Sequence, residues 1–395
     1  MTVTSSEPQV APPDRYAPEF EVVIEGLQAD PSTKNDVIDV KVHRDLEEMS
    51  GFDLTLNNWD DVHRTFKHSD SANFQIGNRV AVKLGYADKL ITVATGTIST
   101  LSPAFPDAAS PTVAISGVDG MMQLKDRKPA DGETTYYRIV TDAQIAQQVA
   151  QRNKLAAQVD STGPTYELVV QKAQDDAAFL MERAKRIDYD CYILPDESTG
   201  VQTLHFVRPT DGRDGGGLRV FRLAYAPGLS TGPTARPAGL VPNLLDFTPT
   251  LTISGQVGKL TVRGWDSRTK QQIVYTASAQ DLPSAPGQRG SSGPALAEKT
   301  LAGRQDVTVD APVASDQEAR ELAISLLREK AYEFITATGR VAGLPELRPG
   351  DNLEIYGLGR RFSGTYFVKR VEHTLSSSGF FTQFTARRVY DGGTE

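Results

Sequence analysis

Apolar and polar residues alternate along the first part of the chain, from residue 20 to about residue 119. The apolar positions of these runs include Phe20, Val22, Ile24, Val40, Val42, Leu54, Leu56, Val80, Val82 and Leu84. A period of two residues is typical of β-strands with one buried face, and the Gly, Pro and Asp residues between the runs are typical of turns. Residues 20–132 are therefore predicted to form an all-β domain, either a small barrel or a sandwich.

The first 19 residues differ from this pattern because they are polar and rich in proline. Such a segment buries too little apolar surface to fold alone, which predicts a disordered tail, or else an arm that becomes ordered on a partner. The segment also lacks the cationic start and apolar core of a signal peptide, so no secretion signal is expected.

Helical spacing appears between residues 133 and 208. Thr141 and Gln144 have the spacing of a capping box at a helix start. A second helix is predicted to begin at Asp175 and Asp176, whose carboxylates would lie at the positive end of the helix dipole. Strand-like segments accompany both helices, so residues 133–208 are predicted to form a small α+β domain.

Two further segments complete the predicted organisation. Residues 209–246 are rich in glycine and proline and are interpreted as a connecting segment. Alternation then resumes and continues almost to the end of the chain, which predicts a second β-barrel domain over residues 247–395.

The second β domain has two predicted interruptions. Residues 281–304 contain many Gly, Pro and Ser residues and are predicted to form a flexible loop. Ser315 and Glu318 again have capping-box spacing, and apolar residues follow at helical intervals, which predicts a helix over residues 315–334.

Parts of the two β domains resemble each other. IGNRVAVKLGY with a later TGTI, within residues 76–98, resembles PGDNLEIYGLG with a later SGTY, within residues 349–366. A weaker likeness links residues 37–45 with residues 258–266. Short glycine-punctuated strands also match by chance, so a duplicated barrel is one of two interpretations. If it is real, three chains could form a ring of six similar positions and join a six-fold partner to a three-fold one.

Charge and hydrophobicity exclude several classes of protein. The 395 residues include 42 Lys and Arg against 50 Asp and Glu, a net charge of -8. This balance disfavours a protein that binds nucleic acid generally by neutralising phosphates, and no specific nucleic-acid partner is predicted. No run of about 18 apolar residues occurs, so stable membrane insertion is not expected.

Candidate catalytic and metal-binding residues are sparse. The five histidines form no recognised metal motif, and His63 and His68 are spaced so that they would not share a helix face. Cys191 alternates with apolar residues and is predicted to lie in a core. Asp60 with Asp61 is interpreted as a turn, and no catalytic, cofactor-binding or metal-binding residue is predicted. His373 is predicted to be a hydrogen-bonded structural residue.

One segment resembles a known family. TYELVVQKAQDDAAFLMERAKRIDYDCYI, followed by LHFVRP, is similar to a stretch of phage late-control protein D and of type VI valine-glycine-repeat spike proteins. The matching residues are Gln171, Asp175, Phe179, Leu180, Arg183 and Ala184. The segments 251–271 and 343–388 resemble the hub subunits of contractile tails and injection systems, so the resemblance covers roughly residues 20–390.

The resemblance implies a fold class and a role. The fold would be α+β and mainly β, with two tube-like β-barrel domains and an intervening small α+β domain. The protein would be a non-enzymatic baseplate hub, a homotrimer that joins the six-fold inner tube to a three-fold spike and contacts other baseplate proteins. Hub proteins fused to a spike continue into further domains, so the spike is expected to be a separate protein.

Ring contacts are expected on the hairpins of the two predicted barrels. The candidate interface residues are Tyr86, Lys89, Arg360, Arg361, Phe362 and Tyr366. Assembly is expected in the bacterial cytoplasm, within a phage tail or a contractile injection particle, and release from the cell is left open. The alternative functions are a cell-wall hydrolase and a carbohydrate-binding component of the same particle.

Overall fold

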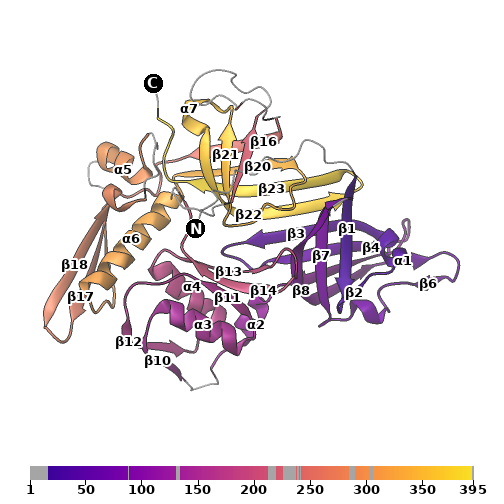
Figure 1. Ribbon diagram of the computed structural model, residues 1–395, viewed down its shortest axis with the longest axis horizontal. Coiled ribbons are helices and arrows are strands. Elements are labelled where there is room, and N and C mark those ends of the chain that lie inside the picture. Colours follow the sequence, from indigo (N-terminus) through magenta and orange to yellow (C-terminus); the bar gives the residue numbers. More distant parts are fainter. Residues whose placement is uncertain are drawn as a thin grey trace, which may run out of the picture.

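The computed structural model describes residues 17–87, 89–129, 134–211, 219–225, 237, 240, 242–283, 290–301 and 306–393. The chain is mainly β, and its largest element is one sheet of 13 strands to which both halves of the sequence contribute (Figure 1). Nearly all strand pairs in this sheet are antiparallel. The predicted mainly β class is therefore confirmed.

The first half of the sequence supplies seven strands and a short helix to this sheet region. They are β1 (Pro18–Ile24), β2 (Leu27–Gln28), α1 (Pro31–Asp36), β3 (Val37–Asp45), β4 (Gly51–Asn57), β7 (Arg79–Tyr86), β8 (Lys89–Ala104) and β9 (Thr112–Val118). The alternation predicted these strands correctly: Phe52, Leu54 and Leu56 are almost fully buried, while the residues between them face solvent in part. Most of the predicted tail lies outside the described residues, and β1 already begins at Pro18.

The second half supplies the remaining strands of the large sheet. They are β15 (Val220–Ala224), β16 (Leu244–Leu251), β20 (Ile335–Ala342), β21 (Asn352–Tyr356), β22 (Gly364–Ser376) and β23 (Gly379–Arg388), with α7 (Gly359–Phe362) between β21 and β22. β15 lies inside the predicted connecting segment 209–246. It pairs in parallel with β21 and is therefore part of the sheet.

The two halves of the sheet are joined directly, because β22 pairs with β3 from Arg370 opposite Asp45 to Ser376 opposite Asp39. The expectation of two separate closed barrels is not met in the described part of the chain, where the sheet remains open. The physical reason is that β3 and β22 satisfy each other's backbone hydrogen bonds instead of closing a barrel within each half.

The small α+β unit follows α2 (Met121–Asp126). It contains β10 (Thr134–Val140), α3 (Asp142–Arg152), β11 (Ala156–Val159), β12 (Tyr166–Lys172), α4 (Asp176–Arg186), β13 (Asp190–Pro195) and β14 (Gln202–Val207). The predicted capping box is present at the start of α3, where Thr141 accepts from the Gln144 amide and Gln144 accepts from the Thr141 amide. At α4, Asp175 caps the Ala178 amide.

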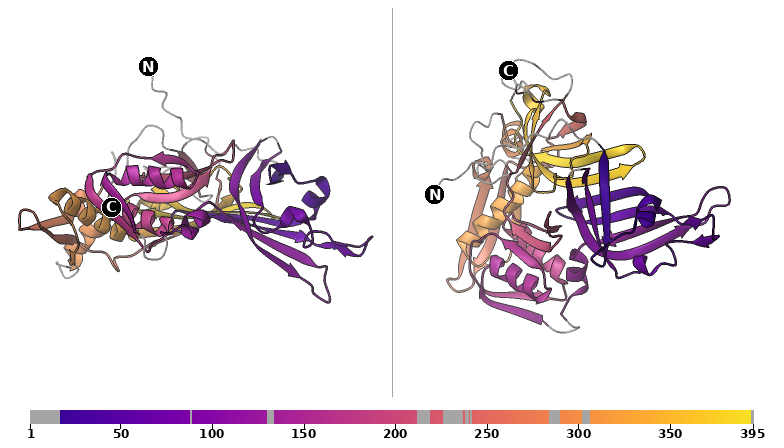
Figure 2. Two further views of the ribbon diagram at one scale, coloured as in Figure 1. Left: turned by 90° about the horizontal axis from the view of Figure 1, so that it is seen from below. Right: turned by 45° about the vertical axis from the view of Figure 1, so that its right-hand side comes forward.

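A third unit is inserted between β16 and β20. It contains β17 (Lys259–Asp266), β18 (Gln271–Ser278), α5 (Gly293–Leu301), β19 (Val307–Asp310) and α6 (Asp316–Tyr332). Figure 2 shows this unit, in orange, at the end of the molecule opposite the first half. The predicted helix over 315–334 is present as α6, and Ser315 caps the Glu318 amide.

The predicted loop over residues 281–304 is wrong for residues 293–301, which form α5. Ala, Leu, Glu and Lys in this segment favour a helix. The Ser292 hydroxyl accepts a hydrogen bond from the Ala295 amide at 3.3 Å and so caps the N-terminus of this helix. Residues 284–289 and 302–305 lie outside the described residues.

Candidate assembly interface

The order of strands is repeated in the two halves of the large sheet. The first half has the order β3-β4-β9-β8-β7-β1, and the second has β16-β20-β23-β22-β21-β15. We call these groups the first repeat and the second repeat. They differ at β1 and β15, because β1 pairs antiparallel with β7 whereas β15 pairs parallel with β21.

Two of the irregularities in the pairing are repeated as well. A register shift between Val37 and Asp39 in β3 corresponds to one between Leu244 and Asp246 in β16. A second shift, between residues 98 and 100 in β8, corresponds to one between residues 368 and 370 in β22. β-Bulges interrupt a ladder at fixed positions, so their coincidence aligns the two repeats residue by residue.

This alignment corrects the sequence-based one in part. Gly77 and Gly350 do correspond, and both have positive φ, at 96° and 91°. However, Val80 lies opposite Gly96 whereas its counterpart Leu353 lies opposite Tyr366, so the predicted match of Gly96 with Gly364 is shifted by two residues. The counterpart of β3 is β16. The weaker likeness of residues 37–45 to residues 258–266 is therefore coincidental, since the latter form β17 in a separate sheet.

The repeats meet at the pairing of β3 with β22, which we call the internal junction. Arg44 is 2% exposed there and donates to the Leu347 carbonyl at 2.5 Å and to His373 Nε2 at 2.7 Å. His373 Nδ1 contacts Thr382 Oγ1 at 2.9 Å. The prediction of a hydrogen-bonded structural histidine is confirmed. A side chain of the first repeat is thus held by acceptors of the second.

Burial controls the charge states at the internal junction. Burial lowers the pKa of Arg44 to about 9, which still leaves it protonated at neutral pH. Burial, reinforced by the Arg44 charge, lowers the pKa of His373 well below its ordinary value. Because Nε2 of His373 accepts from Arg44, the neutral ring carries its proton on Nδ1 and donates it to Thr382.

An unpaired edge of β8 lies at the far end of the first repeat. β8 pairs with β9 along residues 97–104, but the described residues of β7 cover its other edge only up to Thr97. The Asn58 amide donates to the Pro111 carbonyl at 2.9 Å, so the odd-numbered residues of β9 bond to β4 and the even-numbered ones bond to β8. On β8, the even-numbered residues 102 and 104 therefore bond to β9. The backbone of Pro103 faces away from β9, toward the unpaired edge.

β16 presents a matching edge at the far end of the second repeat. Among the described residues, its outer edge makes only one isolated bridge, at Leu244. The Thr252 amide donates to the Phe334 carbonyl at 3.0 Å, so the even-numbered residues of β16 bond to β20 and Pro249 faces outward. Proline lacks an N–H and is confined to such outward positions of edge strands.

An exposed aromatic cluster lies beside the unpaired edge of β8. The hairpin of β5 (Trp59–Asp60) and β6 (Thr65–Phe66) is inserted between β4 and the 3₁₀ turn η1 (Ala72–Phe74). The rings of Trp59 and Phe66 lie 5.5 Å apart, and those of Phe66 and Phe105 lie 5.0 Å apart. Phe105 is 59% exposed. Exposed aromatic groups of this kind are typical of protein interfaces.

One face of the joined sheet is polar across both repeats. Its ionisable residues include Asp39, Lys41, His43, Asp53, Asp246, Arg340, Arg370 and Glu372. Arg340 pairs with Asp246 at 3.0 Å, and Lys41 pairs with Glu372 across the internal junction at 3.1 Å. The opposite face carries the buried hydrophobic cores of the two repeats. The polar face is therefore the water-facing side of the sheet.

The predicted interface residues of the first repeat lie near the internal junction. The Tyr86 hydroxyl donates to the Gly343 carbonyl at 2.8 Å, and its ring lies 5.8 Å from that of Phe380. Tyr86 therefore joins the two repeats within one chain. Lys89 is exposed at the start of β8. Contacts of either residue with another chain stay a prediction.

The predicted interface residues of the second repeat lie in and after α7. Arg360 and Arg361 are exposed and Phe362 is half-buried. Tyr366 is fully buried, and its hydroxyl donates to the Phe362 carbonyl at 2.7 Å. The side chain is thus already buried in the single chain, and a contact of Tyr366 with another chain stays a prediction. The residue lies on the core face of β22, 5.2 Å from the ring of Phe247.

The residues that carry the family resemblance have structural roles in the small α+β unit. Phe179, Leu180 and Ala184 belong to its hydrophobic core. Arg183 donates to the buried carboxylate of Asp142 at 2.6 Å. These contacts explain the motif through packing and helix capping.

Asp176, the second acid at the predicted helix start, also lies at the centre of a buried hydrogen-bond cluster. It is 1% exposed and accepts hydrogen bonds from Arg152 Nε at 2.9 Å, Asn153 at 2.8 Å and Gln171 at 2.9 Å. No local sequence pattern reveals this cluster, because its members come from β12, from α4 and from the C-terminal end of α3. A buried carboxylate needs such partners, so these residues fix the packing of α3 against α4.

The other chemical candidates are occupied or inert. Burial raises the pKa of Cys191 to about 12, which keeps the thiol protonated. His68 contacts Asp36 at 2.9 Å and His63 contacts Asp60 at 2.8 Å, so the two histidines have different partners. No group of three or more His, Cys, Asp or Glu side chains among the described residues is arranged to hold a metal ion.

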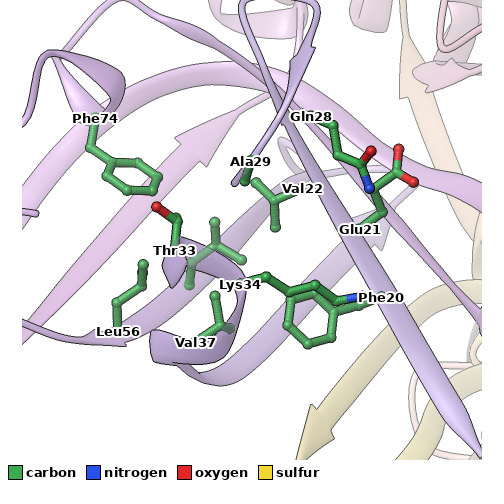
Figure 3. Close-up of a pocket in the computed structure, with 11 residues that line it drawn as sticks. Phe20, Glu21, Val22, Gln28, Ala29, Thr33, Lys34, Val37, Leu56 and Phe74 are labelled. Carbon is green, nitrogen blue, oxygen red and sulfur yellow. The ribbon is translucent and has the colours of Figure 1, made fainter. Parts of the chain in front are cut away.

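Two cavities in the described regions differ in character. Figure 3 shows the smaller, about 10 Å³, where Val22, Leu56 and Phe74 surround a space beneath α1. It has room for about one water molecule. The larger, about 610 Å³, lies between the α+β unit and α6. Its Asp188 accepts from Arg328 at 2.5 Å and from Tyr332 at 2.6 Å, so this carboxylate is engaged in holding the two units together.

None of the helices in the described part of the chain has the length and apolar character needed to cross a bilayer. A family model for the Alg8 N-terminal domain matches residues 16–201 and 239–377, which is most of the chain. The chain belongs to the Alg8 N-terminal domain family. No curated protein matches the sequence significantly.

This Alg8 N-terminal domain protein has the fold of phage tail proteins. It is similar to the 43 kDa tail protein of prophage MuSo2 from Shewanella oneidensis, with a TM-score of 0.65 and 14% identity over 94% of this chain and 98% of the other. A tail protein from Neisseria meningitidis MC58 gives a TM-score of 0.64 and 13% identity over 94% and 97%.

A third similar structure comes from a secretion system. The E. coli c3393 protein is described as a component of the type VI secretion system with structural similarity to the T4 bacteriophage tail proteins gp27 and gp5. It gives a TM-score of 0.56 and 13% identity, over 93% of this chain and 76% of the other. At these identities the likeness establishes a shared fold.

Proposed function

We propose that this protein is a structural hub of a contractile tail or injection particle, in which three copies form a ring of six alternating repeats. Such a ring would join a six-fold inner tube to a three-fold spike, in contact with other baseplate proteins. The proposal includes the late-control protein D type of hub and a role without catalysis. The shared fold with phage tail proteins supports a structural role in such a particle.

The main support for this proposal is the repeated strand order. One pair of strands is joined within the chain, and the equivalent pair is left with free edges in the described regions. Within the chain, β22 of the second repeat pairs with β3 of the first. The equivalent strands are β8 of the first repeat and β16 of the second, and both have an edge without a strand partner among the described residues. Repeating the same step from chain to chain adds two repeats per chain, so a closed ring of six repeats would contain three chains.

The polar face of the sheet would line the central channel of such a ring. The other face is covered by β1, β7, β15, β21 and the hydrophobic cores, so it would form the outer wall. In this arrangement the two tube-like barrels of the predicted fold are completed by neighbouring chains.

Electron microscopy with a solution mass tests the proposal. The purified protein would be imaged alone and with candidate inner tube and spike proteins from the same genome, and its mass would be measured in each sample. We expect a ring with three-fold symmetry and six similar lobes that binds the tube protein on one side and the spike protein on the other. A monomer that joins neither partner would refute the hub.

A further inference from the structure

The internal junction also specifies how one chain meets the next. We propose that the unpaired edge of β8 in one protomer pairs with the unpaired edge of β16 in the neighbouring protomer, in the register that the internal junction sets. This inference rests on the proposed ring and assigns its contacts. The partner is a second copy of the same chain, bound head to tail.

The register follows from the alignment of the repeats. In the internal junction, His373 lies opposite Val42 and Leu375 lies opposite Val40. The counterparts of these residues, obtained from the shared register shifts and strand pairs, give two pairs between chains. They are Pro103 opposite Pro249 and Phe105 opposite Phe247.

The chemistry of the new junction differs from that of the internal one. Arg44 lies opposite Val371 in the internal junction, and the counterparts of this pair are Leu251 and Leu101. A buried arginine with polar acceptors is thus replaced by an apolar pair. Phe105 corresponds to Leu375, which packs against the core of the first repeat. Phe105 would therefore pack beside Phe247 on the core of the second repeat of the next chain.

The exposure of these residues in the single chain is consistent with a surface that another chain covers. Phe105 is 59% exposed in the isolated chain, and Leu245 on β16 is 48% exposed. Leu101, Phe247 and Leu251 are only half-buried. Joining the two edges would cover apolar side chains on both partners, which favours association.

The two facing prolines interrupt the ladder at its centre. Both direct their backbone toward the junction, where a paired residue would normally donate an N–H. Proline cannot donate, so this pair forms no ladder hydrogen bond. The pairs on either side, Leu101 with Leu251 and Phe105 with Phe247, keep their donors. The edges are thus protected against indiscriminate pairing, and the side chains must supply the specificity.

The same equivalence gives α7 a contact. In the internal junction, Tyr86 is the last residue of β7 and its hydroxyl reaches Gly343, whose amide donates to the Phe380 carbonyl. The corresponding loop of the second repeat contains α7, and the counterpart of Gly343 is Asn58, next to Trp59. Arg360 and Arg361 would therefore meet the next chain near the aromatic hairpin. Cations and aromatic rings attract each other, and Asp61 of the hairpin is exposed with opposite charge.

Engineered cysteines test the register. Ser102 and Thr250 are both exposed and fall opposite each other in the proposed junction, at a position where the Cα atoms of an antiparallel pair lie about 4.5 Å apart. This separation permits a disulfide. The double variant Ser102→Cys with Thr250→Cys would be assembled, oxidised and run on a non-reducing gel. We expect loss of the monomer band to covalent dimers and trimers that reduction reverses.

A matched control shares all features except the register. Ser102→Cys with Asp246→Cys also places two cysteines on exposed positions of the same edges, but four residues out of register, or about 13 Å apart along the strand. It should remain monomeric on the gel. Cys191 is buried and is the same in both variants. The two cysteine positions of one chain lie at opposite ends of the sheet, so links form only between chains.

The outcomes separate this inference from the proposed function. Linking of the first pair but not the second supports the register. A three-fold ring in which neither pair links, or both link equally, overturns the register but leaves the ring. A wild-type protein that forms no ring under any of these conditions overturns the proposed function, and the inference with it.

Discussion

Single buried polar residues hold the units of this molecule together. Arg44 reaches from β3 of the first repeat to carbonyl groups of the second, and Asp188 receives Arg328 and Tyr332 from α6. None of these partners is near in sequence. Buried polar groups are costly when they lose a partner, so these contacts should be sensitive to substitution.

Replacing Arg44 tests the strength of the internal junction. Arg44→Met keeps much of the side-chain volume but leaves the Leu347 carbonyl and His373 Nε2 without their donor. We expect a loss of about 3 kcal/mol in the free energy of unfolding, measured with urea. Arg340→Met removes an arginine of the exposed polar face and should change stability by no more than about 0.5 kcal/mol. Equal effects of the two substitutions would contradict the role given to Arg44.

His373 should make stability depend on pH. Its pKa is lowered in the folded state, so below about pH 6.5 the unfolded chain binds a proton at this residue that the folded chain does not. Stability therefore falls as the pH falls. Relative to His373→Gln, the wild-type protein should lose up to about 1.4 kcal/mol per pH unit below pH 6.5. A difference between the two proteins that does not vary with pH would show that His373 is protonated equally in both states.

At the scale of elements, local patterns predicted most strands and helices, but not which strands pair. Period-two alternation identified β3 and β4, and capping residues identified α3, α4 and the start of α6. The pairing of β3 with β22 has no local signal, because the strands are far apart in sequence and each carries an ordinary alternating pattern. The second β domain was expected to begin at Phe247, so only the first residues of β16, Leu244 to Asp246, fell in the predicted connecting segment; Pro249 lies within the strand. Its position on an open edge explains why the strand tolerates it.

The same limits apply to the interface candidates. Hairpin position suggested Arg360, Arg361, Phe362 and Tyr366 as contacts between chains. In the single chain the two arginines are exposed, Phe362 is half-buried and Tyr366 is buried. Exposure of one aromatic residue on a strand depends on the face it occupies, and the register of β22 was not available from the sequence. The edges of β8 and β16 could be found only after the order of strands was known.

The facing prolines give a prediction for the two edge strands. Pro103→Thr combined with Pro249→Thr restores two N–H donors at the centre of the proposed junction, without changing the fold of either edge. Two added hydrogen bonds are worth about 1 to 3 kcal/mol, so self-association should strengthen roughly tenfold or more. Sedimentation velocity over a range of concentrations would measure this. Unchanged association of the double variant would mean that these edges do not meet.

Helix α6 supports the inserted unit and not the large sheet. Leu322 packs in the core shared with β17 and β18, so Leu322→Lys should destabilise this unit by about 3 kcal/mol. Hydrogen exchange should show lost protection in β17 and β18, with β3 and β22 still protected. Glu329→Lys, on an exposed position of the same helix, should leave both regions protected. Loss of protection throughout the sheet would mean that the units fold as one.

At the scale of the whole molecule, one chain carries two repeats that are similar but not identical. They differ where they meet, because the internal junction is polar and buried whereas the proposed junction is apolar and open. This difference has a physical use. The internal junction can form while a single chain folds. The proposed junction forms later, between chains that are already folded. Each folded chain must therefore stay soluble before it assembles.

A substitution at Phe105 tests whether the proposed junction forms only between chains. Phe105→Asp places a charge where the proposed junction is apolar, while the residue is exposed in the single chain, so the monomer should keep its stability and lose the ring. The same substitution at Ile139, which is 78% exposed in the small α+β unit, adds the same charge away from both edges. Sedimentation should then give monomers for Phe105→Asp and wild-type assemblies for Ile139→Asp. If Phe105→Asp forms normal rings, the contact between chains lies elsewhere, and the repeated strand order would reflect gene duplication without a repeated interface.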